Sequence, residues 1–260
     1  MYGRYARTQF GAAYAAALTP GLPDDEVEPL FDPAPYDDAP SWNIIPGCRQ
    51  LILYRESSRC VRWGYLPPWA AALKIRPLSH ARLERLSTGV WSGLLADRRV
   101  IIPCDHWYES IRDDDGAPHS FAVRRANGGP VWMAGLSSML LHGEEDAESG
   151  FVVVSSAADG GPAAAGNSRP VVFSLGMAKA WLDPHTPLEQ ANCFAQEAGL
   201  PVDAFEWHRV SSRVRTRYVD DASVMEPDRE PSIASFIRGT RTPESRGALA
   251  RATPQPAPLV

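Results

Sequence analysis

Short runs rich in β-branched and aromatic residues fill the middle of the sequence, and turn signals separate them. Asp115-Gly116, Asn127–Gly129 and the acidic stretch His142–Gly150 are such signals, because Gly, Asn and Asp tolerate tight turns. Short runs between turns predict strands with mostly antiparallel connections. The predicted strands are Leu51–Arg55, Cys60–Tyr65, Val100–Ile111, Ser120–Arg125, Val131–Leu136 and Phe151–Ser155.

Helical patterns flank this β-rich region. The alanine-rich Ala12–Leu18 favours a helix because alanine has the highest helix propensity. Two further helices are predicted over Met177–Leu182 and Leu188–Gly199, and two further strands over Val171–Phe173 and Phe205–Val210. We therefore predict an α+β fold of mostly antiparallel β structure with peripheral helices.

The prolines divide the chain into a body and a tail. Residues 20–40 are rich in Pro and Asp and predict a surface loop. Beyond Met225, six prolines interrupt a stretch with few apolar residues. Such a composition cannot bury enough surface to offset the entropy of folding. We predict one domain over residues 1–226 and a Pro-rich, disordered tail over residues 227–260.

The composition excludes several classes of protein. No run approaches the roughly 18 apolar residues that a membrane helix needs, and Met1–Phe10 lacks the apolar segment of a signal peptide. The four cysteines have no CxxC spacing, so we expect no disulfide framework, no metal site and no cofactor. The net charge of -5 does not decide nucleic-acid binding, which depends on a local basic groove. We expect a monomeric, cytoplasmic protein.

Seven segments carry a family resemblance that extends over nearly the whole body. They occur in one order and at compatible spacings along the chain. They are MYGRYA at Met1–Ala6, SWNIIPG at Ser41–Gly47, RWGYLPPW at Arg62–Trp69, SHARLE at Ser79–Glu84, IPCDHWYE at Ile102–Glu109, NSRPVV at Asn167–Val172 and WHRV at Trp207–Val210. Together they resemble the SOS response-associated peptidase (SRAP) family.

The resemblance implies a barrel-like fold that binds single-stranded DNA and becomes covalently linked to abasic sites. Members of the family normally begin Met-Cys, and removal of Met exposes an amine and a thiol on one residue. The amine condenses with the ring-opened deoxyribose aldehyde, and the thiol closes a thiazolidine. A Glu, a His and an Asn of the family move protons and anchor the sugar. The name comes from a proposed self-cleavage that frees the cysteine.

This chain departs from the family pattern at three positions. Tyr2 replaces the cysteine, and its phenol cannot close a thiazolidine. Because the second residue is large, Met1 is expected to stay, which moves the amine about 3.3–3.6 Å along the chain. Gly166 or Asn167 replaces the family histidine, and His80 replaces its asparagine. We therefore expect covalent crosslinking to be lost or impaired.

Two retained polar residues mark the predicted site. Glu109 ends a strand-like run where the family has its catalytic acid/base, and the alternative is a solvent-facing strand glutamate. Asn43 lies in the matching loop, where the alternative is a side chain that caps a turn.

A DNA-binding surface is predicted from three arginines and a tryptophan. Arg4, Arg82 and Arg169 match the family's motifs and could hold phosphates, although solvated surface arginines are the alternative. Trp69 could stack on a base or pack in the core. Trp63 is expected in the core.

Substitutes for the missing groups can also be sought in the sequence. His80 and His106 are candidates for the proton shuttle, because an imidazole titrates near neutral pH, and a structural role is the alternative. Cys104 is expected in the core, since an offset of five along one strand puts it on the face opposite Glu109. Cys48, on a loop, is a candidate substitute thiol.

Three hypotheses of function follow. The first is a SRAP-like protein that binds single-stranded DNA and abasic sites in the DNA damage (SOS) response, with covalent chemistry lost or impaired. The second is a lyase in which the Met1 amine forms a Schiff base and Glu109 assists. The third is a scaffold that binds protein partners through its groove or its tail. Proteolysis of other proteins has no support, because no Ser/His/Asp or Cys/His arrangement is indicated.

Overall fold

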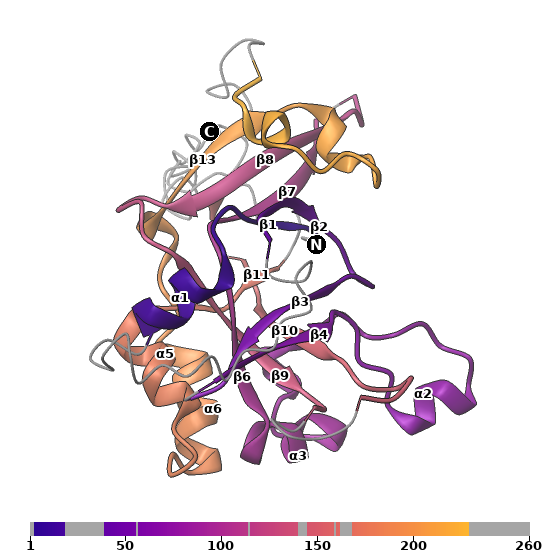
Figure 1. The fold of residues 1–260 in the computed structure, drawn as a ribbon, viewed down its shortest axis with the longest axis vertical. Helices are drawn as coiled ribbons and strands as arrows, with labels where there is room; N and C mark the ends of the chain where they lie inside the picture. Colours follow the sequence, from indigo (N-terminus) through magenta and orange to yellow (C-terminus); the bar gives the residue numbers. More distant parts are fainter. Residues whose placement is uncertain are drawn as a thin grey trace, which may run out of the picture. The chain divides into compact units, whose positions relative to one another are not determined.

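The computed structural model describes residues 3–18, 39–55, 57–113, 115–139, 145–158, 160–161 and 168–228. Its strands form two sheets (Figure 1). Sheet A has the order β13-β8-β7-β1-β2, and all its neighbours are antiparallel. Its strands are β1 (Tyr5–Arg7), β2 (Ser41–Ile44), β7 (His106–Arg112), β8 (Pro118–Arg125) and β13 (Phe205–Val210).

Sheet B is the larger one and has the main order β11-β10-β9-β6-β3-β4. In addition, β12 pairs with β9, and β5 pairs with β10 in the parallel sense. Its strands are β3 (Arg49–Leu53), β4 (Ser58–Arg62), β5 (His80–Arg82), β6 (Arg99–Cys104), β9 (Val131–Ser137), β10 (Phe151–Ser156), β11 (Arg169–Pro170) and β12 (Val172–Phe173).

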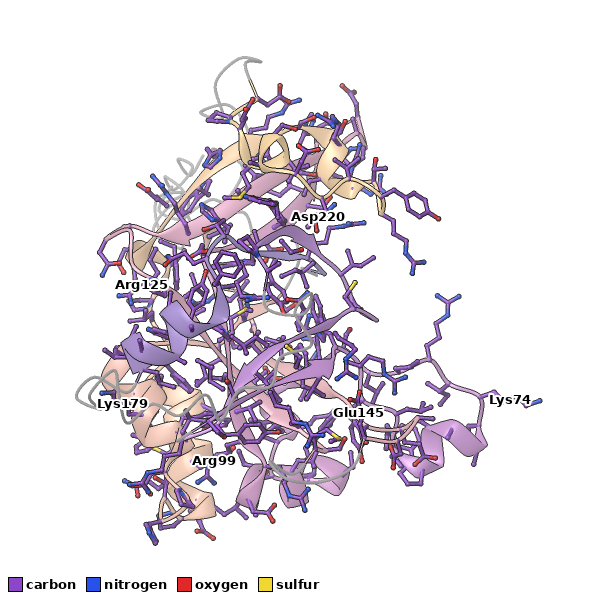
Figure 2. The ribbon with its side chains drawn as sticks, in the orientation of Figure 1. Lys74, Arg99, Arg125, Glu145, Lys179 and Asp220 are labelled. Carbon is purple, nitrogen blue, oxygen red and sulfur yellow. The ribbon has the colours of Figure 1, made fainter. Side chains whose placement is uncertain are left out.

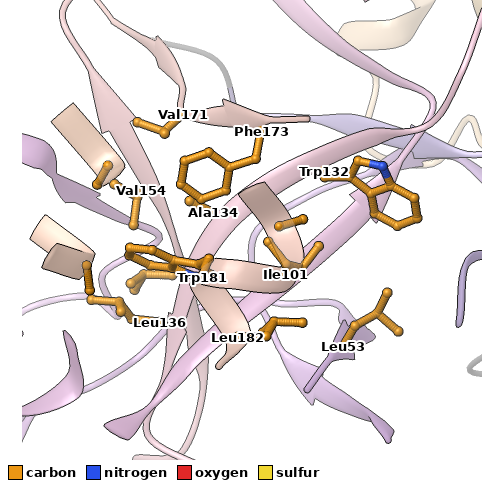
Figure 3. Close-up of a cluster of buried hydrophobic side chains, with 14 of the residues drawn as sticks. Leu53, Ile101, Trp132, Ala134, Leu136, Val154, Val171, Phe173, Trp181 and Leu182 are labelled. Atoms are coloured by element: carbon orange, nitrogen blue, oxygen red, sulfur yellow. The ribbon is translucent and has the colours of Figure 1, made fainter. Parts of the chain in front are cut away.

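Five helices surround these sheets in the described ranges. They are α1 (Gly11–Leu18), α2 (Pro68–Ala72), α3 (Gly89–Asp97), α5 (Leu175–Leu182) and α6 (Leu188–Glu197). Residues of α1, α3, α5 and α6 pack on one face of sheet B, where Trp181 of α5 lies 5.5 Å from Phe173 of β12 between ring centroids (Figure 3). The other face of sheet B packs against sheet A, through residues such as Ile102 and Trp107.

Sheet B is therefore covered on both faces. Every residue of its central strand β6 is buried, because alternate side chains contact the helices and sheet A in turn. A strand buried on both faces has a continuous apolar sequence rather than an alternating one. This explains why the run Val100–Cys104 contains no exposed polar position.

The predicted fold class is confirmed: the chain is α+β with mostly antiparallel sheets. The strands of the described ranges form two stacked sheets rather than one closed barrel. The predicted final strand over Phe205–Val210 is observed with the same bounds, and the alanine-rich helix starts one residue earlier than predicted.

The single strand predicted over Val100–Ile111 is wrong. The chain turns at Asp105, so that β6 belongs to sheet B and β7 to sheet A. The Asp105 carboxylate stabilises this turn by accepting hydrogen bonds from Thr8 N (2.7 Å), Thr8 Oγ1 (2.7 Å) and Tyr14 Oη (2.5 Å). Cys104 and Glu109 therefore lie on different strands, and Cys104 is a core residue as expected.

Two helices were not predicted from the sequence. Helix α3 contains two glycines and a valine, which lower its intrinsic helix propensity. It forms because Leu95 packs into the core cluster against sheet B. Helix α2 is a single short turn that begins at Pro68, where proline at the first helical position costs nothing.

Several predicted features lie outside the described residues. These are nearly all of the loop over residues 20–40, Gly166, Asn167 and residues 229–260. Pro227 and Asp228 are described and contact β13, since Pro227 bridges Val210 and the Asp228 carboxylate pairs with Arg209 at 3.4 Å. Among the described helices, none is long and apolar enough to cross a membrane.

Arg99 connects two helices to sheet B, and Figure 2 labels it. Its side chain is 6% exposed, and its guanidinium donates to carbonyls at the C-terminal ends of α3 and α5. The acceptors are Leu95 O (2.8 Å), Ala96 O (2.9 Å), Trp181 O (2.7 Å), Asp183 O (2.7 Å) and Thr186 O (3.2 Å). Carbonyls at helix ends have no partner within the helix, so a planar five-donor group is well suited to satisfy them.

We predict that Arg99→Lys lowers the free energy of unfolding by about 2–4 kcal/mol. An ammonium has three donors and cannot reach carbonyls of both helices, so at least two buried acceptors lose their partner. Urea denaturation measures the difference, with Arg85→Lys as the control, because Arg85 is exposed. Equal losses in the two variants would contradict this role of Arg99.

Candidate functional site

Glu109 lies in the middle of β7 and is only 1% exposed. Its Oε1 accepts a hydrogen bond from Trp107 Nε1 at 3.0 Å, because residues two apart in a strand share a face. Its Oε2 is buried and has no hydrogen-bond partner within the described ranges. The alternative of a solvent-facing strand glutamate does not fit this burial.

The burial of Glu109 changes its protonation. Loss of hydration raises the pKa of Glu109 to about 8, while the charge of the amino terminus and the bond from Trp107 lower it. At neutral pH the carboxyl group is therefore mostly protonated. A protonated carboxyl can donate a proton, which is what a general acid needs.

Strand β1 brings the beginning of the described chain beside Glu109. Tyr5 pairs with Trp107, and Tyr108 N donates to Arg4 O at 3.0 Å. The antiparallel register therefore puts Gly3 opposite Glu109. Met1 and Tyr2 lie outside the described residues.

His80, on β5, is separated from Tyr5 of β1 by the ring of Trp63. Its ring packs edge-on against Trp63 at 5.8 Å, and Trp63 in turn packs against Tyr5 at 5.2 Å. Ser79 Oγ is 2.9 Å from His80 Nδ1. Trp63 is fully buried, as its sequence context favoured.

The His80 imidazole is neutral at physiological pH. Burial, together with the positive charges of the amino terminus and Arg82, lowers the pKa of His80 to about 4. Burial therefore shifts the titration of His80 away from the neutral pH that the sequence predicted. An imidazole with so low a pKa is a weak base, so at neutral pH it stays uncharged and can form hydrogen bonds without taking up a proton.

His106 and the cysteines are less well placed. His106 is separated from Glu109 by three positions of β7, so the two side chains point to opposite faces. Burial also lowers the pKa of His106 to about 4. Burial raises the pKa of the Cys104 thiol well above its ordinary value, so Cys104 is inert, whereas Cys48 is exposed.

Arg4 and Asn43 bind each other and a distant segment. Arg4 Nη1 donates to Asn43 Oδ1 at 2.8 Å, and Arg4 Nη2 donates to Arg215 O at 2.8 Å. Asn43 Nδ2 donates to Thr216 O (3.0 Å) and Val219 O (2.6 Å). Asn43 is 5% exposed, so the structure uses its amide for anchoring rather than for a local turn.

The other predicted DNA contacts differ in exposure. Arg82 is exposed at the end of β5, and Trp69 is 49% exposed on α2, so neither belongs to the core. Arg169 is half-buried on β11, and its Nη1 donates to Leu200 O at 2.6 Å.

Sequence reasoning missed two residues of the site. Trp107 orients Glu109, and its position two residues before Glu109 was the available signal. Asp220 was missed because it acts on β2 from a distance: it accepts from Trp42 N (2.5 Å), Asn43 N (2.8 Å) and Ser41 Oγ (2.8 Å). Among the described residues, no three His, Cys, Asp or Glu side chains are grouped so as to hold a metal ion.

Comparison with known proteins gives consistent matches. The model of the SOS response associated peptidase (SRAP) family matches residues 1–217. Abasic site processing protein YedK of Escherichia coli (strain K12) is 30% identical over 234 residues, which cover 87% of this chain and 100% of the relative. Abasic site processing protein YoaM of Bacillus subtilis (strain 168) is 24% identical over 78% of this chain and 91% of the relative.

Solved structures share the fold. A phage-related protein from Bordetella bronchiseptica superposes with a TM-score of 0.67 at 27% identity, covering 81% of this chain and 94% of the other. A protein from Bacteroides thetaiotaomicron reaches a TM-score of 0.71 at 13% identity over 86% of this chain and 99% of the other. The second likeness concerns the fold alone.

We predict that Glu109 makes the protein less stable as the pH rises. Between the ordinary value of 4.5 and the folded value of about 8, the unfolded chain releases this proton while the folded protein keeps it. The free energy of unfolding then falls with pH, by at most about 1.4 kcal/mol per pH unit. Glu109→Gln removes this dependence.

Urea denaturation across this pH range measures the effect. The stability of Glu109→Gln relative to the native protein should grow with pH, whereas Glu84→Gln, an exposed carboxylate, should follow the native protein. A constant difference between native protein and Glu109→Gln would mean that the buried carboxyl ionises at its ordinary pH.

Proposed function

Because the chain belongs to the SRAP family, we propose that it binds single-stranded DNA at abasic sites in the DNA damage (SOS) response. Two relatives are named abasic site processing proteins. The observation that carries the proposal for this chain is the burial of Glu109, which raises its pKa to about 8, on the strand that pairs with the N-terminal strand β1.

The proposal assigns separate tasks to the site and its surroundings. Glu109 donates a proton at an abasic sugar, and His80, which stays neutral, offers its ring for a hydrogen bond to the sugar. Arg82 and Trp69 are exposed and contact the DNA strand. Arg4 and Asn43 maintain the shape of the site through the hydrogen bond between their side chains. Arg169 stabilises the chain at the edge of the site through its hydrogen bond to Leu200 O.

In this proposal the covalent crosslink is lost. The thiol that would close a thiazolidine is absent from the residue that carries the amine, since Tyr2 stands in place of the cysteine. The Cys104 thiol is buried, and the exposed Cys48 thiol is not on the same residue as the amine. DNA binding is assigned to the domain, which includes Pro227 and Asp228 through their contacts with β13, and the proposed tail begins after Asp228. The protein acts as a monomer in the cytoplasm and needs no cofactor.

Schiff-base lyase activity is the second candidate, and the raised pKa of Glu109 favours it. The nitrogen of the Met1 amine attacks the aldehyde carbon of the ring-opened abasic sugar and forms a carbinolamine. Its hydroxyl takes the proton of Glu109 and leaves as water, while the nitrogen lone pair forms the iminium bond. This step needs a proton donor at neutral pH, which Glu109 is.

We predict that Tyr2→Cys restores a heat-stable adduct. The variant and the native protein are incubated with a single strand that carries one abasic site and run on denaturing gels with and without borohydride. The native protein should bind the strand in a native gel but give no heat-stable adduct, whereas Tyr2→Cys should give one without borohydride. A native adduct seen only with borohydride would support the lyase.

Tyr2→Ser is the matched control, because it has a small second residue but no thiol. It should give no heat-stable adduct. A heat-stable adduct of the native protein would contradict the loss of crosslinking. No adduct with Tyr2→Cys would contradict a retained Glu109 site, and absence of any native binding would overturn the proposed function.

We predict that Arg82→Ala weakens DNA binding in a salt-dependent manner. Loss of one phosphate contact should reduce the slope of log affinity against log salt by about 0.7 for a single strand. Fluorescence anisotropy at increasing salt measures this slope. Lys179→Ala is the control, because Lys179 lies on α5, on the side opposite Lys74 of the α2 region in Figure 2. Equal slopes for Arg82→Ala and the native protein would exclude Arg82 from the binding surface.

A further inference from the structure

A surface pocket of about 320 Å³ lies between β2, the loop after it and the segment that contains Asp220. Figure 2 labels Asp220 at this edge of sheet A. Asn43, Cys48, Arg49, Arg217, Tyr218 and Asp220 line it. None of the tasks assigned above to Glu109, His80, Arg82 or Trp69 uses this pocket.

Two exposed residues of the pocket, Arg217 and Tyr218, project from a firmly held turn. Tyr218 is 90% exposed and Arg217 is also exposed. The backbone on both sides is anchored, because Asn43 Nδ2 binds Thr216 O and Val219 O. A rigid turn that presents an unsupported aromatic ring loses little entropy when a ligand packs on that ring.

Of the three charged side chains that line the pocket, one arginine can bind an external anion. Asp220 is occupied by two backbone N–H groups and a hydroxyl of β2. Arg49 pairs with Glu145 and donates to Cys60 O at 2.7 Å. Arg217 makes no hydrogen bond or ion pair with any residue in the described ranges, so its guanidinium can accept an anion from outside.

We propose that this pocket binds one nucleotide of the DNA strand beside the abasic site. The base stacks on the ring of Tyr218, and Arg217 holds an adjacent phosphate. An aromatic face next to an arginine fits this chemistry, because every base has a π-face and every linkage carries a negative charge. The inference rests on the proposed function and names a further contact of the same strand.

The position of the pocket relative to Glu109 fits a continuous strand. Strand β2 lines the pocket, β1 is its neighbour, and β7 with Glu109 is the next strand. Two strand spacings amount to about 10 Å. A DNA strand spans this distance in roughly three nucleotides at duplex spacing, and in fewer when it is extended.

The test uses the full chain and single strands that contain a tetrahydrofuran abasic analogue, which cannot react covalently. A 2-aminopurine is placed at successive positions on either side of the analogue, because its fluorescence falls when it stacks on an aromatic ring. We expect quenching at one flanking position. Tyr218→Ala should abolish this quenching and weaken binding roughly 5- to 100-fold.

Control variants separate stacking from other effects. Tyr218→Phe should keep both the quenching and the affinity, since stacking does not need the hydroxyl. Arg217→Ala should weaken binding and lower the salt slope by about 0.7. Phe10→Ala, which removes another exposed ring at a residue that does not line the pocket, should change neither.

Each outcome decides between the two proposals. Quenching that persists in Tyr218→Ala overturns the proposal that a base stacks in this pocket, and it leaves the proposed binding of abasic sites unaffected. Tyr218-dependent quenching with an unmodified strand, without preference for the analogue, supports the pocket and contradicts the abasic-site function. Absence of binding to either strand overturns both.

Discussion

The carboxylate of Asp105 is the contact on which the rest of the arrangement depends. This carboxylate accepts hydrogen bonds from Thr8 and Tyr14, and the backbone N–H of Asp105 donates to Ala6 O at 2.9 Å. These bonds lie where the chain leaves sheet B and enters sheet A, so they connect β1, α1 and both sheets at one point. Burial and the bond to Asp105 raise the pKa of Tyr14, which keeps its phenol protonated as the donor. Because β1 is held against β7 in this way, the beginning of the described chain lies beside Glu109.

The chemistry of the site follows from the layered packing around it. The interface between the two sheets is apolar, and Glu109 and His80 lie beside its residues Trp107 and Trp63. Removal from water raises the pKa of the carboxyl group and lowers that of the imidazole, so both groups are neutral at physiological pH. Glu109 then carries a proton to donate, whereas the His80 ring stays uncharged and can take part in hydrogen bonds. The same burial that destabilises the folded protein at high pH makes Glu109 suitable as an acid.

The polar residues near β2 show how a binding surface can be held without being part of the core. Arg4, Asn43 and Asp220 form hydrogen bonds that connect the residue before β1, strand β2 and the segment around Val219. Their contribution to DNA binding is therefore indirect in our proposal, since they hold the turn from which Arg217 and Tyr218 project. Arg82 and Trp69 differ, because their side chains are open to solvent and can contact a strand directly.

The sequence by itself determined the fold class and the family, and it singled out Glu109 as a candidate, because these depend on local patterns: short apolar runs between turns, and motifs in a given order. It also indicated that Trp63 belongs to the core. Only the tertiary structure decided that the run through Asp105 is two strands, that His80 does not titrate near neutrality, and that Arg4 and Asn43 bind the chain near residue 216. Those properties arise from contacts between segments as much as 211 positions apart. Burial and hydrogen-bond partners across such separations are set by how the sheets stack, which no local pattern encodes.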